Sequence, residues 1–346
     1  MNDTTPTIAA DNSFDIPEPI YRPPFNTTRA SHVVLRVADL GASRDFYTGV
    51  IGLVVSDEDA NAVYLRGMEE ICHHSLVLKK AVGKPKAECV GMRVLTEDDL
   101  DELVVFYKQA GLAAEFVEAD YQGRTVRTRD PVGVPIEFCA SMETRPRLLT
   151  EFDRYTGGSA MRLDHYQIHT PNPLDALRHY MSFGFRLSEY IVRPSGDIIG
   201  VFLQRKGNPH DIVFFDGPGP RLHHFAYMSG ESQNLFRACD CAGQMGFGKN
   251  LEFGPGRHGP AFGLFTYFRD PDGHRVELFS NHYQTIDIDD QPVRWQIGDE
   301  NFSRVWVLPA QKSWFTEASP FEGIDVVKPD HDHAPLTLQK FLEGKK

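Results

Sequence analysis

The sequence predicts an α+β protein that folds as two similar halves, each made of two β-α-β-β-β units. Three observations carry this prediction. A β-branched strand at 31–37 and the helix after it return 133 residues later, at 164–180. A turn of the form Asp-Pro-x-Gly with an apolar strand after it occurs at 130–138 and again 140 residues later, at 270–278. The length of 346 residues suits two domains of ordinary size, so an internal duplication explains the pattern best.

The first half is expected to span residues 29–145. Residues 1–28 are polar and proline-rich, which predicts an arm. Order begins with the strand at 31–37, and Asp39 has the residue type and position of a helix N-cap. A further helix is predicted at 97–110, before the strand that follows the first Asp-Pro-x-Gly turn.

The second half is expected to span residues 160–284. It repeats the strand and then a helix that Asn172 is predicted to cap, and a second helix follows at 233–245. Residues 285–346 lose the pattern and form a C-terminal extension. The extension contains all three tryptophans, which predicts that it packs against the body of the protein.

Composition excludes several classes of protein. The 36 basic and 48 acidic residues give a formal charge of −12, which argues against a nucleic-acid-binding or anionic membrane surface. No segment approaches the roughly 18 consecutive apolar residues of a membrane span, and the first residues do not have the pattern of a signal peptide. The five cysteines are odd in number and lack a repeated CxxC spacing, so we expect reduced thiols and a cytoplasmic location.

Nine of the 14 histidines lie between His165 and His282, which directs the search for chemistry to the second half. His223 and His224 are neighbours on an apparent strand, where successive side chains point to opposite faces. His165 and His224 are each followed by an aromatic residue and occupy the same point of their units. We therefore expect His224 to share a site with His165, and His223 to face the other way.

Glu277 lies in an apolar strand after the second Asp-Pro-x-Gly turn. A buried, unpaired carboxylate costs several kcal/mol, so Glu277 needs a cation. Two neutral imidazoles and one carboxylate form the facial triad of non-haem Fe(II) sites, with coordination positions left open. The alternative is three separate residues: two core histidines with backbone partners, and Glu277 paired with Arg275. The shared register in a duplicated frame favours the triad.

Three more residues in this half suit proton handling. His210 begins an expected strand, His258 lies in a glycine-rich loop, and Tyr267 lies on the strand before the second Asp-Pro-x-Gly turn. Each also has an ordinary explanation: solvation at a strand end for His210, a surface loop for His258, and a core aromatic for Tyr267.

Three segments together, 220–224, 254–259 and 270–277, resemble the type I extradiol ring-cleaving catechol dioxygenases of the vicinal-oxygen-chelate superfamily, and most closely the homoprotocatechuate 2,3-dioxygenase group. The likeness extends from about residue 29 to the region of 313–317. It implies four βαβββ modules paired into two tandem vicinal-oxygen-chelate barrels plus the C-terminal extension, with metal only in the second pair, and commonly a homotetramer.

The resemblance also implies roles for single residues. One metal ion per chain, Fe(II) or in some relatives Mn(II), would be bound by His165, His224 and Glu277. His210 would be the acid–base residue, and His258 and Tyr267 would hydrogen-bond the substrate oxygens. The substrates would be a catechol and O₂, and the product a 2-hydroxymuconic semialdehyde. A small-molecule-binding protein on the same scaffold, or a metal-dependent isomerase or lyase, is the alternative.

The sequence departs from the homoprotocatechuate group where that group binds its substrate carboxylate with two arginines. The matching positions here are Phe253 and Ser303, with Arg294 and Arg304 nearby as the only candidates to take over. We therefore predict a catechol with a neutral alkyl, aryl or halo substituent.

Three residues are predicted to contact that substrate beside the acid–base groups. Phe202 and Phe253 would provide apolar walls. Gln167, two residues after His165, replaces an asparagine of the family and keeps an amide group.

Alignment of the two halves places His32, Cys89 and Glu137 where His165, His224 and Glu277 stand. A cysteine beside valine and glycine is usually a small core residue. We therefore expect the first half to hold no metal ion.

Overall fold

The computed structural model describes residues 16–299, 302, 305–330 and 335–344. The first half contains two β-α-β-β-β modules. One module consists of β1 (Thr27–Val37), α1 (Leu40–Phe46) with a π-helical turn (Tyr47–Ile51), β2 (Val54–Glu58), β3 (Ala62–Arg66) and β4 (Leu76–Lys80). The next consists of β5 (Lys86–Val94), α2 (Asp98–Gln109), β6 (Ala114–Val117), β7 (Thr125–Arg129) and β8 (Pro135–Cys139).

The second half repeats this order twice. Its modules are β9 (Ala160–Thr170), α3 (Pro173–Ser182), β10 (Arg186–Val192), β11 (Ile198–Gln204) and β12 (Ile212–Asp216), then β13 (Arg221–Ser229), α4 (Gln233–Gln244), β14 (Leu251–Arg257), β15 (Leu264–Arg269) and β16 (Arg275–Ser280). The extension adds β17 (Val293–Gln296), α5 (Lys312–Thr316), β18 (Ser319–Pro320) and α6 (Leu338–Glu343). Single 3₁₀ turns lie at Phe152–Arg154, Gly248–Asn250 and Pro260–Phe262. The predicted four-module α+β fold is confirmed.

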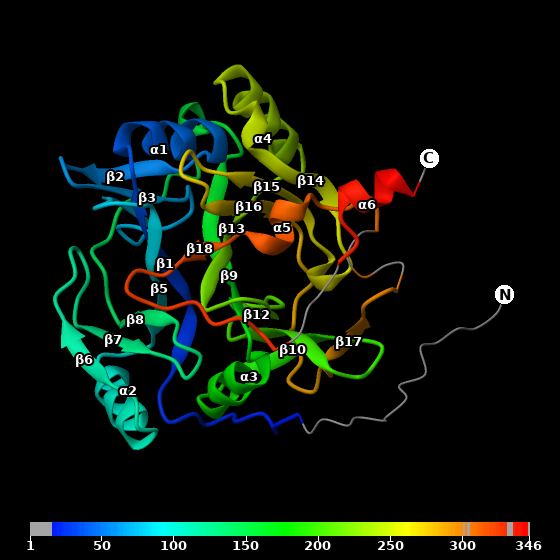
Figure 1. Ribbon diagram of the computed structural model, residues 1–346. Coiled ribbons are helices and arrows are strands. Elements are labelled where there is room, and N and C mark those ends of the chain that lie inside the picture. The colour runs from blue at the N-terminus through cyan, green and yellow to red at the C-terminus, as the bar shows by residue number, and fades with distance from the viewer. Residues whose placement is uncertain (1–15, 300–301, 303–304, 331–334, 345–346) are drawn as a thin grey trace.

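Each half forms one sheet. The strand order is β2-β3-β4-β1-β5-β8-β7-β6 in the first half and β14-β15-β16-β13-β9-β12-β11-β10-β17 in the second, where β18 also pairs with β13. The helices of the two halves meet at two places: the turn Tyr47–Ile51 after α1 packs against α4, and Tyr107 of α2 lies within hydrogen-bond distance, 3.2 Å, of His179 of α3. Figure 1 shows α1 and α4 toward one end of the molecule and α2 and α3 toward the other. A single hydrophobic core contains buried residues of both halves.

The duplicated turns exchange hydrogen bonds between the halves. Tyr47 of the first half donates to Asp270 of the second at 3.0 Å, and Tyr180 of the second donates to Asp130 of the first at 3.2 Å. Each aspartate also accepts backbone N–H groups of its own turn. All four residues are buried, so the repeat seen in the sequence is also the contact that holds the halves in register.

Of the two predicted helix N-caps, one is confirmed and the other is not. Asp39 caps α1 as predicted, accepting from the backbone of Ala42 at 3.0 Å. The side chain of Asn172 makes no capping bond, so that prediction was wrong.

The extension crosses both halves, since β18 pairs with β13 and the backbone of Glu322 bonds to β5 (Figure 1). Trp306 is 49% exposed, and its backbone pairs with that of Arg257 at the end of β14.

All five cysteines are free thiols, as expected. Among the described residues no helix has both the length and the apolar character needed to cross a membrane.

Candidate metal centre and catalytic site

Three neighbouring strands bring His165, His224 and Glu277 together. His165 lies on β9, His224 on the adjacent β13, and Glu277 on β16 beyond it. Oε2 of Glu277 lies 3.2 Å from Nε2 of His165 and 3.3 Å from Nε2 of His224. The three side chains are buried, and their ligand atoms all lie within 4.8 Å of one another. Arg275 does not neutralise Glu277, because its guanidinium pairs with Glu252 at 2.6 Å.

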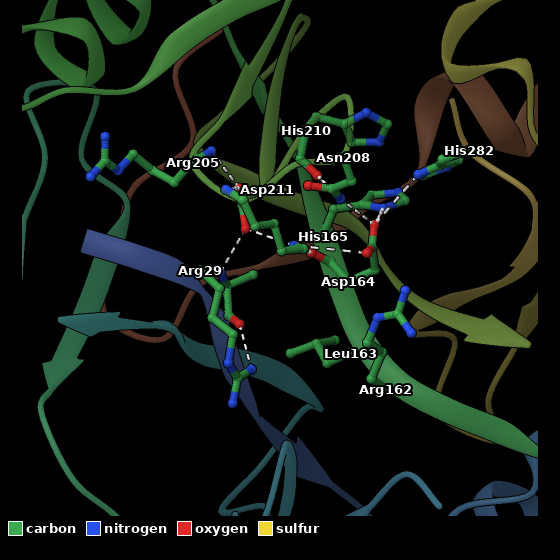
Figure 2. Close-up of polar contacts among 12 residues, drawn as sticks. Arg29, Arg162, Leu163, Asp164, His165, Arg205, Asn208, His210, Asp211 and His282 are labelled. Atoms are coloured by element: carbon green, nitrogen blue, oxygen red, sulfur yellow. Dashed lines mark hydrogen bonds and ion pairs between the residues drawn. The ribbon is translucent and has the colours of Figure 1, made fainter. Parts of the chain in front are cut away.

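A bulge in β9 determines which nitrogen of His165 carries the hydrogen. The register between β9 and β13 shifts at Asp164, which places its carboxylate beside the ring of His165 (Figure 2). Oδ2 of Asp164 accepts from Nδ1 of His165 at 3.0 Å and from Nδ2 of Asn208 at 2.9 Å. Burial raises the pKa of Asp164, but Lys206 and His165 outweigh it and hold that pKa well below its usual range. With its hydrogen on Nδ1, His165 presents an unshared pair on Nε2.

A second bulge, in β13, determines which ring nitrogen of His224 carries the hydrogen. Leu222 pairs with Ile168 and His224 with Gln167, so His223 is an extra residue in β13. The prediction that His223 points away from His224 was therefore wrong, since strict alternation fails at a bulge. The Nδ1 atoms of the two rings lie 2.8 Å apart, and Nε2 of His223 lies 2.9 Å from the backbone oxygen of Trp314.

That chain of contacts fixes the tautomer of His224. A carbonyl oxygen only accepts, so His223 carries its hydrogen on Nε2 and its Nδ1 accepts from Nδ1 of His224. Burial lowers the pKa of His223 well below its ordinary value and that of His224 to about 4, so both rings are neutral near pH 7. Nε2 of His224 is left with an unshared pair.

Two imidazole nitrogens and one carboxylate oxygen therefore converge in a buried space, and the arrangement calls for a positive charge between them. Burial lowers the pKa of His165, but Asp164 and Glu277 outweigh it and raise that pKa, so a proton on His165 supplies the charge until a metal ion replaces it. The donor set, two neutral imidazoles and one carboxylate, suits a divalent transition metal such as Fe(II) or Mn(II). The residues present fit such an ion.

His210 lies next to this cluster at the start of β12. Its ring centroid is 4.1 Å from that of His165 and 5.3 Å from that of Phe202. Burial lowers its pKa well below the ordinary value, so the imidazole is neutral. Its Nδ1 is buried and lacks a hydrogen-bond partner among the described residues. An imidazole in this state is available to take up or deliver a proton beside the metal centre.

His282 is a further histidine of this site that the sequence did not single out. Its ring lies 5.2 Å from that of His210 (Figure 2) and stacks on Phe279 at 4.0 Å. Its Nδ1 is 3.7 Å from Oδ2 of Asp164. Burial lowers its pKa to about 3. In the sequence, the feature that could have indicated His282 is its position just after the strand that contains Glu277.

His258 and Tyr267 approach the centre from β14 and β15. Nδ1 of His258 donates to the backbone oxygen of Pro260 at 2.5 Å, so its Nε2 accepts, and Nε2 lies 4.0 Å from Oε1 of Glu277. The ring of Tyr267 lies 5.2 Å from that of His224. Burial and the adjacent Glu277 raise the pKa of Tyr267 well above its ordinary value, so it remains a phenol that can donate.

Aromatic and aliphatic side chains surround the polar groups. Phe253 stacks on Tyr267 at 6.0 Å and lies 5.0 Å from Trp314 of the extension. On the side of His210, Phe202 belongs to a second apolar cluster, which also contains Ile191, Ile199, Val213, Phe215, Trp295, Ile297 and Phe302. Gln167 is partly buried and lies on the same face of β9 as His165.

The positions considered above for binding a substrate carboxylate are Phe253, Arg294, Ser303 and Arg304. Arg294 is exposed on β17 and donates to Gln296 at 3.3 Å. Ser303 and Arg304 lie outside the described residues. Phe253 provides no charge.

The functional neighbours that sequence reasoning missed are Asp164, His223, His282 and Trp314. Asp164 precedes the first expected ligand and is the one with a local signal, because an acidic residue adjoining a ligand histidine is a common orienting partner. The contact between Trp314 and His223 joins residues 91 positions apart and has no such signal.

Comparison with known proteins shows the family of this chain. The profile of the Glyoxalase/Bleomycin resistance protein/Dioxygenase superfamily matches residues 29–138 and 162–278. The manganese-dependent 2,3-dihydroxybiphenyl 1,2-dioxygenase of Geobacillus genomosp. 3 is 30% identical over 298 residues, which cover 81% of this chain and 94% of that protein. The metapyrocatechase of Geobacillus stearothermophilus is 28% identical over 324 residues, covering 89% and 98%.

This chain is also similar to solved structures of an extradiol dioxygenase. A mutant of homoprotocatechuate 2,3-dioxygenase from Brevibacterium fuscum is 34% identical and superposes with a TM-score of 0.87, covering 92% of this chain and 90% of that one. The anaerobic complex of the same enzyme with 3,4-dihydroxyphenylacetate is 35% identical with a TM-score of 0.85, covering 90% and 100%.

Proposed function

Because this chain belongs to the extradiol catechol dioxygenases of the Glyoxalase/Bleomycin resistance protein/Dioxygenase superfamily, we propose that it inserts both atoms of O₂ into a catechol with a neutral alkyl, aryl or halo substituent. The product is of the 2-hydroxymuconic semialdehyde type. One observation carries the proposal: two imidazole nitrogens, of His165 and His224, and a carboxylate oxygen of Glu277 are buried together and lie within 4.8 Å of one another.

His165, His224 and Glu277 would hold one Fe(II) or Mn(II) ion per chain. When bound, the metal ion offers open positions to the catechol oxygens and O₂ and allows electrons to pass between them. The other residues bind and orient the substrate and move its protons. We further propose that 29–145 is a metal-free domain, that 160–284 is the catalytic domain, and that 285–346 is an extension that covers the site through Trp314. The arm predicted for 1–28 lies partly outside the described residues, which begin at 16, and its last two residues belong to β1.

The hydrogen bonds of the site assign a task to each polar group. Nε2 of His258 is free to accept the proton of one catechol hydroxyl, since its Nδ1 hydrogen is held by Pro260. The hydroxyl of Tyr267 can donate to a catechol oxygen. The neutral imidazole of His210 delivers a proton to, or removes one from, the reacting oxygen. Burial of His210 and Tyr267 shields their proton transfers from bulk water, whereas His258 is partly exposed.

A reconstitution experiment tests the proposal. The purified protein is freed of metal, loaded anaerobically with Fe(II) or Mn(II), mixed with a panel of catechols and then exposed to O₂. We expect oxygen uptake together with the yellow semialdehyde product. Binding of catechol without oxygen uptake indicates a small-molecule-binding protein, and turnover without O₂ indicates an isomerase or lyase. Either result contradicts the proposal.

Substrate preference is a first prediction. 4-Methylcatechol and 3-phenylcatechol should have a kcat/KM more than about tenfold above that of 3,4-dihydroxyphenylacetate, because a carboxylate without a cationic partner costs several kcal/mol to bury. The measurement is steady-state oxygen uptake. Phe253→Arg should narrow the difference by supplying a cation, whereas Phe253→Leu should not. A wild-type preference for the carboxylated catechol would remove the neutral-substrate assignment.

The tautomer of His165 leads to a second prediction. Asp164→Asn should weaken Mn(II) binding roughly 10–100-fold, the usual cost of losing a partner that orients a metal-ligating histidine. Titration calorimetry of the metal-free protein measures this. Asp211→Asn is the matched control, because Asp211 is also buried and also binds Lys206 but belongs to the next strand (Figure 2). Equal affinities in all three proteins would show that Asp164 does not orient the ligand.

A further inference from the structure

The first half contains a second copy of the site, and cross-strand register identifies its members. Glu137 pairs with Arg127 as Glu277 pairs with Tyr267, so Arg127 occupies the position of Tyr267. Cys89 pairs with Val34 as His224 pairs with Gln167.

The same correspondence extends to two more residues. Val33 pairs with Leu76 as Tyr166 pairs with Ile212, so His74 occupies the position of His210. The remaining member is His32, in the position of His165. The copy therefore has five residues: His32, His74, Cys89, Arg127 and Glu137.

In the first half, the carboxylate of Glu137 is neutralised by hydrogen-bond donors of the protein itself. Arg127 binds Oε1 of Glu137 through Nη2 and through Nε at 3.1 Å, and Nε2 of His32 lies 3.2 Å from Oε2. The Glu137 side chain is only 3% exposed, whereas that of Arg127 is 42% exposed and reaches inward from the surface. Burial raises the pKa of Glu137, but the hydrogen bonds from His32 and Arg127 outweigh it and hold that pKa well below its usual range.

One neighbouring residue reverses the tautomer of the histidine. The residue before His165 is Asp164, which takes the Nδ1 hydrogen, but the residue before His32 is Ser31. Oγ of Ser31 lies 3.1 Å from Nδ1 of His32 and can donate to it, so His32 carries its hydrogen on Nε2 and donates to Glu137. Three donors, His32, Arg127 and Gln122, thus replace the convergence of acceptors in the other half.

We propose that Arg127 takes the place of a metal ion in the first half, so that His32, Cys89 and Glu137 form a latent divalent-metal site that the guanidinium keeps closed. Burial raises the pKa of Cys89 well above its ordinary value, so this position offers a neutral thiol and a poor ligand. A cavity of about 90 Å³ adjoins the pair and is lined by Tyr64, His74 and Arg127 among others. Nε2 of His74 is buried there without a partner among the described residues.

Metal stoichiometry of a small set of variants tests this inference, which rests on the proposed metal site of the second half. Each metal-free variant is loaded with Mn(II), separated from free ion by gel filtration, and analysed for metal per chain, with circular dichroism as the check on folding. The wild type is expected to hold one ion per chain. Cys89→His/Arg127→Tyr, which copies the catalytic half at these two positions, is expected to hold two, because the retained hydroxyl of Ser31 can rotate to accept from Nδ1 of His32 and leave its Nε2 free for the ion.

The matched control is Cys89→His/Arg124→Tyr. Arg124 lies on the surface, paired with Asp101, so this variant supplies the same imidazole and loses the same charge while Arg127 remains. It should hold one ion. A second ion in the control, or a folded Cys89→His/Arg127→Tyr protein that still holds one ion, would overturn the role of Arg127.

The opposite exchange, made in the second half, tests the inference if Cys89→His/Arg127→Tyr does not fold. Tyr267→Arg introduces a guanidinium beside Glu277 and should release the metal ion of the second half, whereas Tyr267→Phe should keep it. Retention of the ion by Tyr267→Arg would contradict the inference. A wild-type protein without any ion would overturn the proposed catalytic site itself, and the two failures are thereby distinguished.

Discussion

Glu277→Ala is expected to abolish both metal retention and oxygen uptake. The substitution removes the one anionic ligand of three and leaves two neutral imidazoles, so the loss of affinity should exceed the roughly 10–100-fold caused by loss of an outer partner. It also removes the carboxylate oxygen that lies 3.2 Å and 3.3 Å from the Nε2 atoms of the two imidazoles. Metal analysis after gel filtration, together with oxygen uptake on 4-methylcatechol, measures the effect.

Two further variants separate charge from shape. Glu277→Gln has nearly the same volume and should lose the metal ion as well, because an amide oxygen is neutral. Glu137→Gln is the matched control: Glu137 is buried on the equivalent strand of the first half, and the variant should keep one ion and wild-type turnover. If Glu277→Ala folds and retains wild-type metal content, the ion is held elsewhere.

His210→Phe should slow turnover by roughly 10²-fold or more, the usual contribution of a general acid–base group. The substituted ring fills a similar space beside Phe202, and none of the three ligand atoms is removed, so the metal content should stay at the wild-type value. The rate loss should therefore appear in kcat of a fully loaded protein. Oxygen uptake and metal analysis on the same sample test both parts.

The first half supplies the control for this substitution too. His74 is buried at the position equivalent to His210, and His74→Phe should leave turnover unchanged. A His210→Phe protein with wild-type kcat would remove His210 from the proton transfers. An equal loss in both variants would indicate a general effect of replacing a buried histidine.

Periodic features were predictable from the chain. Strand and helix periods are local, so the four modules, the helices α2 and α4 and the cap at Asp39 followed from residue types at short spacing. The duplication extended this local information across the chain, because residues at equal offsets in two copies of one fold occupy equivalent positions. His165, His224 and Glu277 were singled out in this way before any distance was known.

Simple alternation failed where the strands are bulged. The rule predicted His223 on the far side of β13, but an extra residue in the strand turns its ring beside that of His224. The same device in β9 places Asp164 beside His165. A bulge is set by pairing with the neighbouring strand, so its place depends on another segment and does not follow from period two.

The sequence by itself determined the fold class, the duplication and the identity of the three candidate ligands, because these depend on residue type and local period. Only the tertiary structure decided the protonation pattern that makes one copy suitable for a metal ion and the other not. In the second half, Asp164 and the His223–Trp314 contact draw the imidazole hydrogens away from Glu277. In the first half, Arg127 and His32 donate to Glu137. The His223–Trp314 and His32–Glu137 hydrogen bonds join residues 91 and 105 positions apart, and the bonds of Asp164 and His223 to their chain neighbours depend on bulges, so the pairing of distant strands selects the partners.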